Sequence, residues 1–196
     1  DLEAAVQAYL ESLATATAAG DTTQRVLSHN NTAFHLMLLG RLEEAREHID
    51  AALALSDAYD LRVPCQFLYS TRGEIALAAG ELDDAEGWFN RSLAEAGHFD
   101  NREHMAKGKA NLAQVAARRG DTDTALIWLE EAETVARPLT ARYLQAQIDL
   151  WLAYLYAERE ERGAALAALS RAEDKLKGGH YGRLAGLAAA LRRTLT

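Results

Sequence analysis

Apolar positions along this chain follow a helical period, and the pattern itself returns every forty residues. Each copy reads Gly, a short polar step, Ala, a large apolar residue four positions later and a small residue three positions after that. These spacings place the three residues on one face of a helix. The successive triplets are Ala45, Ile49 and Ala52; Ala85, Phe89 and Ser92; Ala125, Leu129 and Ala132; and Ala165, Leu169 and Ala172. A fixed period in this range predicts a stacked array of helical repeats.

The glycine that opens each copy predicts a tight turn between two helices. Gly40, Gly80 and Gly120 each follow an apolar helical stretch, and a helix often ends in the left-handed backbone conformation that Gly adopts at low cost. Acidic residues follow in the first turn of the next helix, where they favour the helix dipole. The fourth copy has Glu160 at this position and Gly163 three residues later, so we expect its turn to be reshaped.

The pattern predicts an all-α fold, an α-solenoid of about ten helices in antiparallel pairs. We expect one repeat domain over residues 1–196. Capping-box patterns at Asp21 with Gln24 and at Asp100 with Glu103 indicate the starts of two of its helices. The expected helices run to 19, then over 21–39, 42–58, 64–79, 82–96, 100–119, 122–136, 140–158, 163–177 and 180–195. The expected units are the second helix of a truncated unit at 1–19, helix pairs at 21–59, 61–99, 100–139 and 140–178, and a terminal helix at 180–196. Because the chain begins in the middle of a unit, we also expect it to be a fragment of a larger protein.

A second column of small residues lies in the first helix of each pair, seven residues before the turn position. It reads Ala33, Gly73, Ala113 and Ala153. With the turn glycine and the triplet of the second helix, this column resembles the tetratricopeptide repeat over essentially the whole chain. The resemblance implies a right-handed superhelix whose first helices line a concave groove. The period of forty is longer than the family's usual length of about thirty-four, which predicts longer helices. In repeat length the chain looks like the arms of bacterial regulators of the maltose-activator and Rap types.

Composition excludes several classes of function. Lys and Arg number 21 against 29 Asp and Glu, a formal charge of −8 that argues against direct binding of nucleic acid. The only cysteine, Cys65, excludes an internal disulfide and favours a reducing, cytoplasmic setting. Its surroundings carry no catalytic motif, so we expect a small core residue. No apolar run is long enough for a membrane helix, and we expect no membrane partner.

Residues that commonly perform catalysis or bind metals show no recognisable spacing. The six histidines form no His-x-x-x-His pair, and no cysteine stands at a metal-ligand spacing. The repeated glycines end helices instead of following strands, so they do not form a phosphate-binding loop. We therefore expect no metal, no cofactor and no enzymatic activity.

The resemblance implies that a partner is bound by the first helix of each pair. One face of each such helix would line the groove, with amides to hold a peptide backbone and apolar side chains as anchors. The candidate residues are Asn30, Phe34 and Met37; Ser70, Glu74 and Leu77; Lys107, Gln114 and Arg118; and Gln147, Tyr154 and Glu158.

The sequence thus favours a non-catalytic scaffold that binds a protein or peptide segment. The alternative is a regulatory arm of a multidomain bacterial transcription regulator, in which a small molecule or signalling peptide changes the curvature of the array. Self-association through the ends of the array is left open, and the pattern does not identify the partner.

Overall fold

The computed structural model describes residues 1–179 and 181–196, and the regular elements in these ranges are ten helices. The helices are α1 Leu2–Ala19, α2 Thr22–Leu38, α3 Leu42–Ala58, α4 Cys65–Ala79, α5 Leu82–His98, α6 Arg102–Arg118, α7 Thr122–Ala136, α8 Arg142–Glu158, α9 Arg162–Leu176 and α10 Gly182–Leu195. The expected all-α fold of about ten helices is confirmed. His180, the expected start of the tenth helix, lies outside the described residues.

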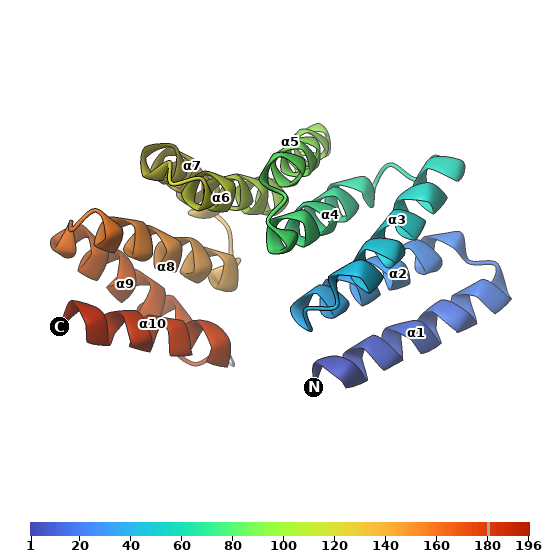
Figure 1. The fold of residues 1–196 in the computed structure, drawn as a ribbon, viewed down its shortest axis with the longest axis horizontal. Coiled ribbons are helices and arrows are strands. Elements are labelled where there is room, and N and C mark those ends of the chain that lie inside the picture. Colours follow the sequence, from blue (N-terminus) through green and yellow to red (C-terminus); the bar gives the residue numbers. More distant parts are fainter. Residues whose placement is uncertain (180) are drawn as a thin grey trace. The chain divides into compact units, whose positions relative to one another are not determined.

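The helices form two compact units, which we treat separately. The first unit, Asp1–Asp100, contains α1 to α5, and the second unit, Asn101–Thr196, contains α6 to α10. Within the units, helices that follow one another across a short turn pack side by side, as α2 and α3 or α8 and α9 do (Figure 1). In the first unit α2 has α1 as a second close neighbour, because α1 packs along α2 after the two-residue turn at Gly20 and Asp21.

The turn before each second helix has the predicted left-handed residue. Gly40, Gly80 and Gly120 have φ values of 77°, 81° and 79°. The fourth turn is not reshaped as expected, because Glu160 itself takes φ 61° at the position of the missing glycine. The same hydrogen bond then closes the α6–α7 and α8–α9 turns: Asp121 N donates to Ala116 O at 3.0 Å, and Glu161 N donates to Tyr156 O at 2.9 Å.

One of the two predicted caps is confirmed and the other is wrong by one residue. Asp21 accepts a hydrogen bond from the Gln24 amide at 2.9 Å and opens α2. At the start of α6 the cap is Asn101, whose side chain accepts from the His104 amide at 3.1 Å. Asp100 cannot cap this helix because it lies in the preceding turn with φ 48°, a conformation unlike the extended backbone of an N-cap.

The repeated triplets face the first helices, as their spacing predicts. Phe89 is fully buried, and a Cβ added to Gly73 would lie 2.6 Å from two of its ring atoms. This contact explains the small residue at that column: the aromatic ring occupies the space that a side chain on α4 would need. Cys65 is buried, in agreement with the expected core position.

Candidate functional site

A polar or aromatic contact recurs between the two helices of successive pairs. Its members stand nineteen residues apart in the sequence, at 29 and 48, at 69 and 88, and at 109 and 128. In the second pair, the rings of Tyr69 and Trp88 have centroids 5.7 Å apart. In the third, Lys109 Nζ lies 5.0 Å from the centroid of the Trp128 ring. The fold therefore brings these two columns together at one location in each of these three pairs.

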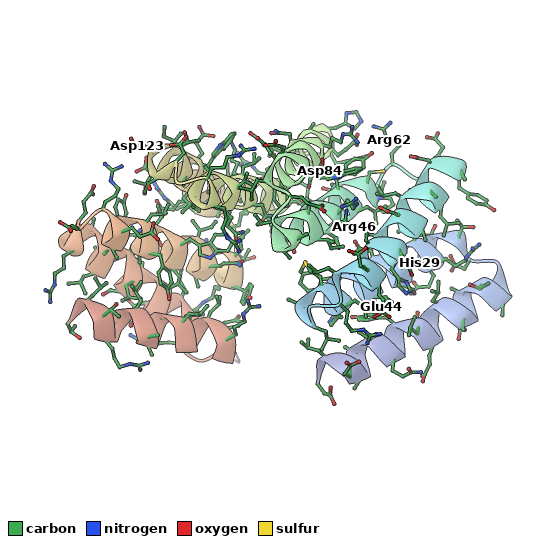
Figure 2. The ribbon with its side chains drawn as sticks, viewed as in Figure 1. His29, Glu44, Arg46, Arg62, Asp84 and Asp123 are labelled. Carbon is green, nitrogen blue, oxygen red and sulfur yellow. The ribbon has the colours of Figure 1, made fainter. Side chains whose placement is uncertain are left out.

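In the α2–α3 pair the contact consists of two histidines. His29 Nδ1 and His48 Nδ1 are 3.0 Å apart, and the ring centroids are 5.1 Å apart. One of the two nitrogens must carry the proton and the other must accept it, so the contact requires at least one neutral imidazole. Both rings are partly buried, and Figure 2 shows His29 within the first unit.

Burial keeps both rings neutral. It lowers the pKa of His29 to about 4, and the neighbouring His48 and Arg25 act in the same direction. Burial also lowers the pKa of His48, although Glu47 and Glu44 oppose that shift. At neutral pH the pair is therefore uncharged and holds an unprotonated ring nitrogen inside the hydrogen bond.

In the second unit the corresponding positions carry charges. Lys109 contacts Trp128 and also forms an ion pair with Glu131 of α7. In the α8–α9 pair, the column residue is Asp149, which is fully buried. Its carboxylate accepts from Arg171 Nε at 2.8 Å and from Lys175 Nζ. Two cations from α9 thus compensate one buried carboxylate, as a charge in this position requires.

The candidate residues of the first unit lie on α2 and α4, which contact each other. Phe34 and Met37 are partly buried, and Phe34 packs edge-on against the ring of His35 with centroids 5.5 Å apart. Asn30 Nδ2 donates to Asn31 at 3.4 Å, while its buried Oδ1 meets no donor among the described residues. On α4, Ser70 is buried and donates to Glu74 at 3.1 Å.

The candidate residues of α6 form a polar stripe. Lys107, Gln114 and Arg118 stand at intervals of seven and four, which is one face of a helix. Asn111 lies on the same face and accepts a hydrogen bond from Gln114 Nε2 at 3.3 Å. We call Lys107, Asn111, Gln114 and Arg118 the α6 stripe. Arg118 is exposed and Lys107 and Gln114 are partly exposed, whereas Asn111 is buried, so solvent reaches the Gln114 amide between two cations.

The α8 candidates differ in their accessibility. Tyr154 donates its hydroxyl to Leu187 O of α10 at 3.3 Å, so this side chain already contacts the following helix. Gln147 is partly buried and Glu158 is exposed at the end of α8. Each predicted set thus lies on one helix of its unit. A continuous groove along all four first helices stays a prediction.

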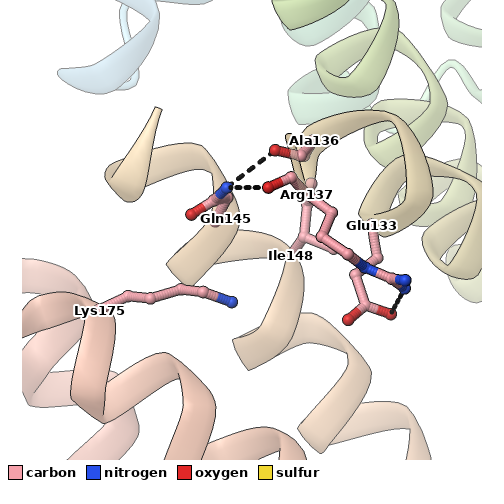
Figure 3. A pocket seen from close by; sticks show the side chains of 6 residues that line it. All are labelled: Glu133, Ala136, Arg137, Gln145, Ile148 and Lys175. Atoms are coloured by element: carbon pink, nitrogen blue, oxygen red, sulfur yellow. Dashed lines mark hydrogen bonds and ion pairs between the residues drawn. The ribbon is translucent and has the colours of Figure 1, made fainter. Parts of the chain in front are cut away.

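The second unit also contains a small pocket of about 120 Å³ between α7, α8 and α9, shown in Figure 3. Gln145 lies on its wall and donates to the carbonyls of Ala136 at 2.8 Å and Leu139 at 2.9 Å. Lys175 is paired with Asp149, and Arg137 lies 3.9 Å from Glu133. The pocket's charged groups are therefore already used to hold the ends of α7 and α9.

Sequence reasoning missed the histidine pair, Asp149 and the place of Asn111 in the stripe. A signal was available for the pair. The columns at 29, 69, 109 and 149 and at 48, 88 and 128 keep one spacing, and the tryptophan column was visible. The sequence does not show that these two columns face each other, because this depends on how the two helices pack.

Within the described ranges, no three or more His, Cys, Asp or Glu residues are grouped to hold a metal ion. Among the described helices, none is long and apolar enough to cross a membrane.

Comparison with known proteins places this geometry in a known fold. No family model matches the chain, and no curated protein matches it. BtubC (BKLC) from P. vanneervenii has a similar structure, with a TM-score of 0.76, 18% identity and coverage of 98% of this chain and 84% of that chain. The TPR-like repeats of a putative kinesin light chain from Podosopora anserina give a TM-score of 0.64 at 18% identity, covering 89% and 86%.

A third similar structure is a STAND signal-transduction ATPase with a tetratricopeptide repeat sensor from Pyrococcus horikoshii. Its TM-score is 0.68 at 13% identity, covering 88% of this chain and 26% of that chain. The fold is a tetratricopeptide-like helical repeat. At these identities the likeness establishes the fold, whereas the narrower resemblance to maltose-activator and Rap-type regulators finds no support in these matches.

Proposed function

We propose that this repeat array is a non-catalytic scaffold that binds an extended protein segment along the exposed faces of its first helices. The α6 stripe is the observation that carries this proposal. It places the partly exposed amide of Gln114, which is hydrogen-bonded to the buried Asn111, between two cationic side chains on one helix face. Amides of Asn and Gln can pair with both the N–H and the C=O of a peptide, and cations attract carboxylates.

The charge of α6 favours an acidic partner segment. The helix contains four Lys or Arg residues and one acidic residue, Glu103, in a chain whose formal charge is −8. A basic helix in an acidic protein attracts an acidic segment, while the acidic remainder of the surface repels it. This arrangement increases specificity more than affinity. We therefore propose an acidic, extended peptide segment as the ligand of the α6 stripe, with no nucleic acid and no membrane as partner.

The remaining candidates extend this surface. Phe34 and Met37 on α2 offer partly exposed apolar atoms for an anchor side chain, next to the polar Asn30. We propose them as a second contact region within the first unit, together with Glu74. On α8, Gln147 and Glu158 are proposed as contacts, while Tyr154 contributes through its ring because its hydroxyl is bound to Leu187. A single, buried thiol at Cys65 supports our placing this function in the cytoplasm.

The test is a selection of peptides from a random displayed library, followed by titration of the selected peptides in fluorescence anisotropy. The informative variants are Arg118→Glu and Gln114→Ala. Arg183→Glu is the matched control, because it makes the same charge change at an exposed position of the same unit outside the stripe. We expect acidic peptides whose affinity falls about tenfold or more in Arg118→Glu and falls with salt, while the control binds as the parent does.

Equal affinities for the parent and the two stripe variants would refute the assignment of the α6 stripe. In that case a variant with Asn30, Phe34 and Tyr154 changed to Ala would locate the contact elsewhere on the first helices. Circular dichroism of each variant establishes that the helices are intact before binding is compared.

The second candidate function is that of a sensor arm in a larger regulator. The similarity to a STAND ATPase that carries a tetratricopeptide repeat sensor favours it, since this chain matches about a quarter of that protein. In that function the bound peptide or small molecule would change the relation between helix pairs. A change in the hydrogen-exchange protection of both units on binding one selected peptide would support the sensor; protection confined to α6 would support the scaffold.

A further inference from the structure

We propose that His29 and His48 form a binding site for a divalent transition metal that prefers imidazole ligands, and that Cu²⁺ is the ion bound most tightly. Their two Nδ1 atoms lie 3.0 Å apart on two different helices, which is the separation of two neighbouring donors on one metal ion, and a small rotation of the two rings would turn both nitrogens from their hydrogen bond toward such an ion. This inference is independent of the proposed peptide binding, because it concerns the contact between α2 and α3.

The separation of the two nitrogens selects among metals. With metal–nitrogen bonds of about 2.05 Å, donors 3.0 Å apart subtend about 94° at the metal. Adjacent positions of a square-planar or tetragonal site require an angle near about 90°, which Cu²⁺ and Ni²⁺ favour. A tetrahedral Zn²⁺ would need the two nitrogens about 3.3 Å apart, so it requires a slight separation of the two rings.

The protonation of the pair suits a metal as well. A metal ligand must be a neutral imidazole, and burial keeps both rings neutral at neutral pH. When the ion binds, the proton shared between the two Nδ1 atoms leaves this position and the ring that carried it becomes protonated on Nε2. Each histidine stays neutral, so binding by the pair itself releases no net proton.

The surroundings leave room for the other ligands. Both rings are partly exposed, so water can occupy the remaining coordination positions. Glu44 and Glu47 of α3 place negative charge near His48, which favours a cation, whereas Arg25 of α2 opposes it at His29. Glu44 is one helical turn before His48 and is now bound to Arg41 at 2.6 Å.

The other helix pairs show that this contact does not need histidine for packing. Tyr69 and Trp88 fill the same location by ring stacking, and Lys109 and Trp128 fill it by a cation–aromatic contact. Neither pair offers two nitrogen lone pairs. Of these three helix pairs, α2 and α3 therefore combine the nitrogen atoms of a chelate with a suitable separation.

The experiment uses Cu²⁺ supplied as its glycine complex, titrated calorimetrically into the whole chain at neutral pH. The variants are His29→Gln and His48→Gln, each of which removes one ligand. The double variant His29→Tyr with His48→Trp reproduces the Tyr69–Trp88 contact and therefore removes both ligands while it keeps the packing. His98→Gln is the matched control, because His98 is exposed in the same unit and outside the pair.

We expect the parent and His98→Gln each to bind one equivalent of Cu²⁺ tightly. The electron paramagnetic resonance spectrum should show coupling of the copper to two imidazole nitrogens. Each single variant should bind at least about tenfold more weakly, and the double variant should lose the strong site. The metal should also raise the Tm of the parent and not that of the double variant. Strong binding that persists in the folded double variant, or no strong equivalent in the folded parent, would overturn the proposal.

Discussion

The α2–α3 pair of the first unit and the α8–α9 pair of the second place the same column of residues at the contact between their helices, but fill it with opposite chemistry. In the first unit two neutral histidines share one proton. In the second unit a fully buried carboxylate, Asp149, is held by two cations of α9. One contact thus depends on the absence of charge and the other on its compensation, although the backbone around them repeats.

This difference separates what holds the fold from what is free to vary. The fold depends on the small column of the first helix and the large residue of the second, which recur in every pair, as Gly73 and Phe89 do. The neighbouring contact at 29, 69, 109 and 149 needs only two side chains that satisfy each other. Function-specific chemistry can therefore enter at that contact without loss of the repeat.

The strongest test of the comparison removes the compensation in the second unit. Changing Arg171 and Lys175 together to Met leaves Asp149 buried without a partner cation. We expect a loss of about 3 to 5 kcal/mol in the free energy of unfolding, measured by urea denaturation. Adding Asp149→Leu to this double variant should recover much of the stability, since it removes the uncompensated charge. Failure of the third substitution to recover stability would mean that the two cations act through packing.

The contact that is shared by both units can be broken in the first. In Gly73→Ala the new Cβ meets the ring of the fully buried Phe89, so we expect a loss of about 1 to 3 kcal/mol in thermal or urea unfolding. The second unit suggests a compensating change, because its corresponding positions hold Ala113 and the shorter Leu129, both buried. The double variant Gly73→Ala with Phe89→Leu reproduces that combination and should be more stable than Gly73→Ala alone. If the two changes add instead, size complementarity does not explain this column.

The histidine pair of the first unit predicts that the stability of the protein depends on pH. The pKa of His29 is lowered to about 4 in the folded protein, below the ordinary value of 6.5, so the unfolded chain binds more protons between these values. The free energy of unfolding should therefore fall as pH decreases from about 6.5 to about 4. Because the ring is partly exposed, we expect about 1 kcal/mol over this window.

The measurement is the urea midpoint as a function of pH, compared with His29→Gln. The glutamine variant should lose this part of the pH dependence, since it retains a polar contact without the titration. His98→Gln serves as the control and should follow the parent. An unchanged slope in His29→Gln would assign the pH dependence to other groups, such as Glu44, whose pKa is lowered by its hydrogen bond to Arg41.

The sequence predicted the fold well because the fold rests on a local, repeated pattern. The spacing of glycine, Ala45 and Ile49 indicates a turn and a helix face directly, and both appear where they were expected. The cap at Asn101 was missed because two neighbouring residues, Asp100 and Asn101, carry equally good cap side chains, and only the backbone conformation decides between them. The polar contacts were missed because they join residues nineteen or more positions apart, and their pairing follows from how two helices face each other.

The α6–α7 and α8–α9 turns of the second unit offer the finest test, since they place different residues, Gly120 and Glu160, in the same left-handed conformation. Glu160 takes φ 61°, a conformation that costs a residue with a Cβ about 1 kcal/mol or more, while Gly120 takes φ 79° without that cost. Replacing Glu160 by Gly relieves the strain but also makes the unfolded chain more flexible, which offsets part of the gain. We expect Glu160→Gly to be more stable by about 0.5 kcal/mol and Gly120→Glu to be less stable by about 1 kcal/mol in urea unfolding. Arg159 and Glu161 beside this turn form an ion pair at the surface, with Arg159 Nε 2.8 Å from Glu161 Oε1. Opposite signs for the two substitutions would show that the left-handed residue sets the stability of this turn, whereas a loss in both would show that the Glu160 side chain itself contributes.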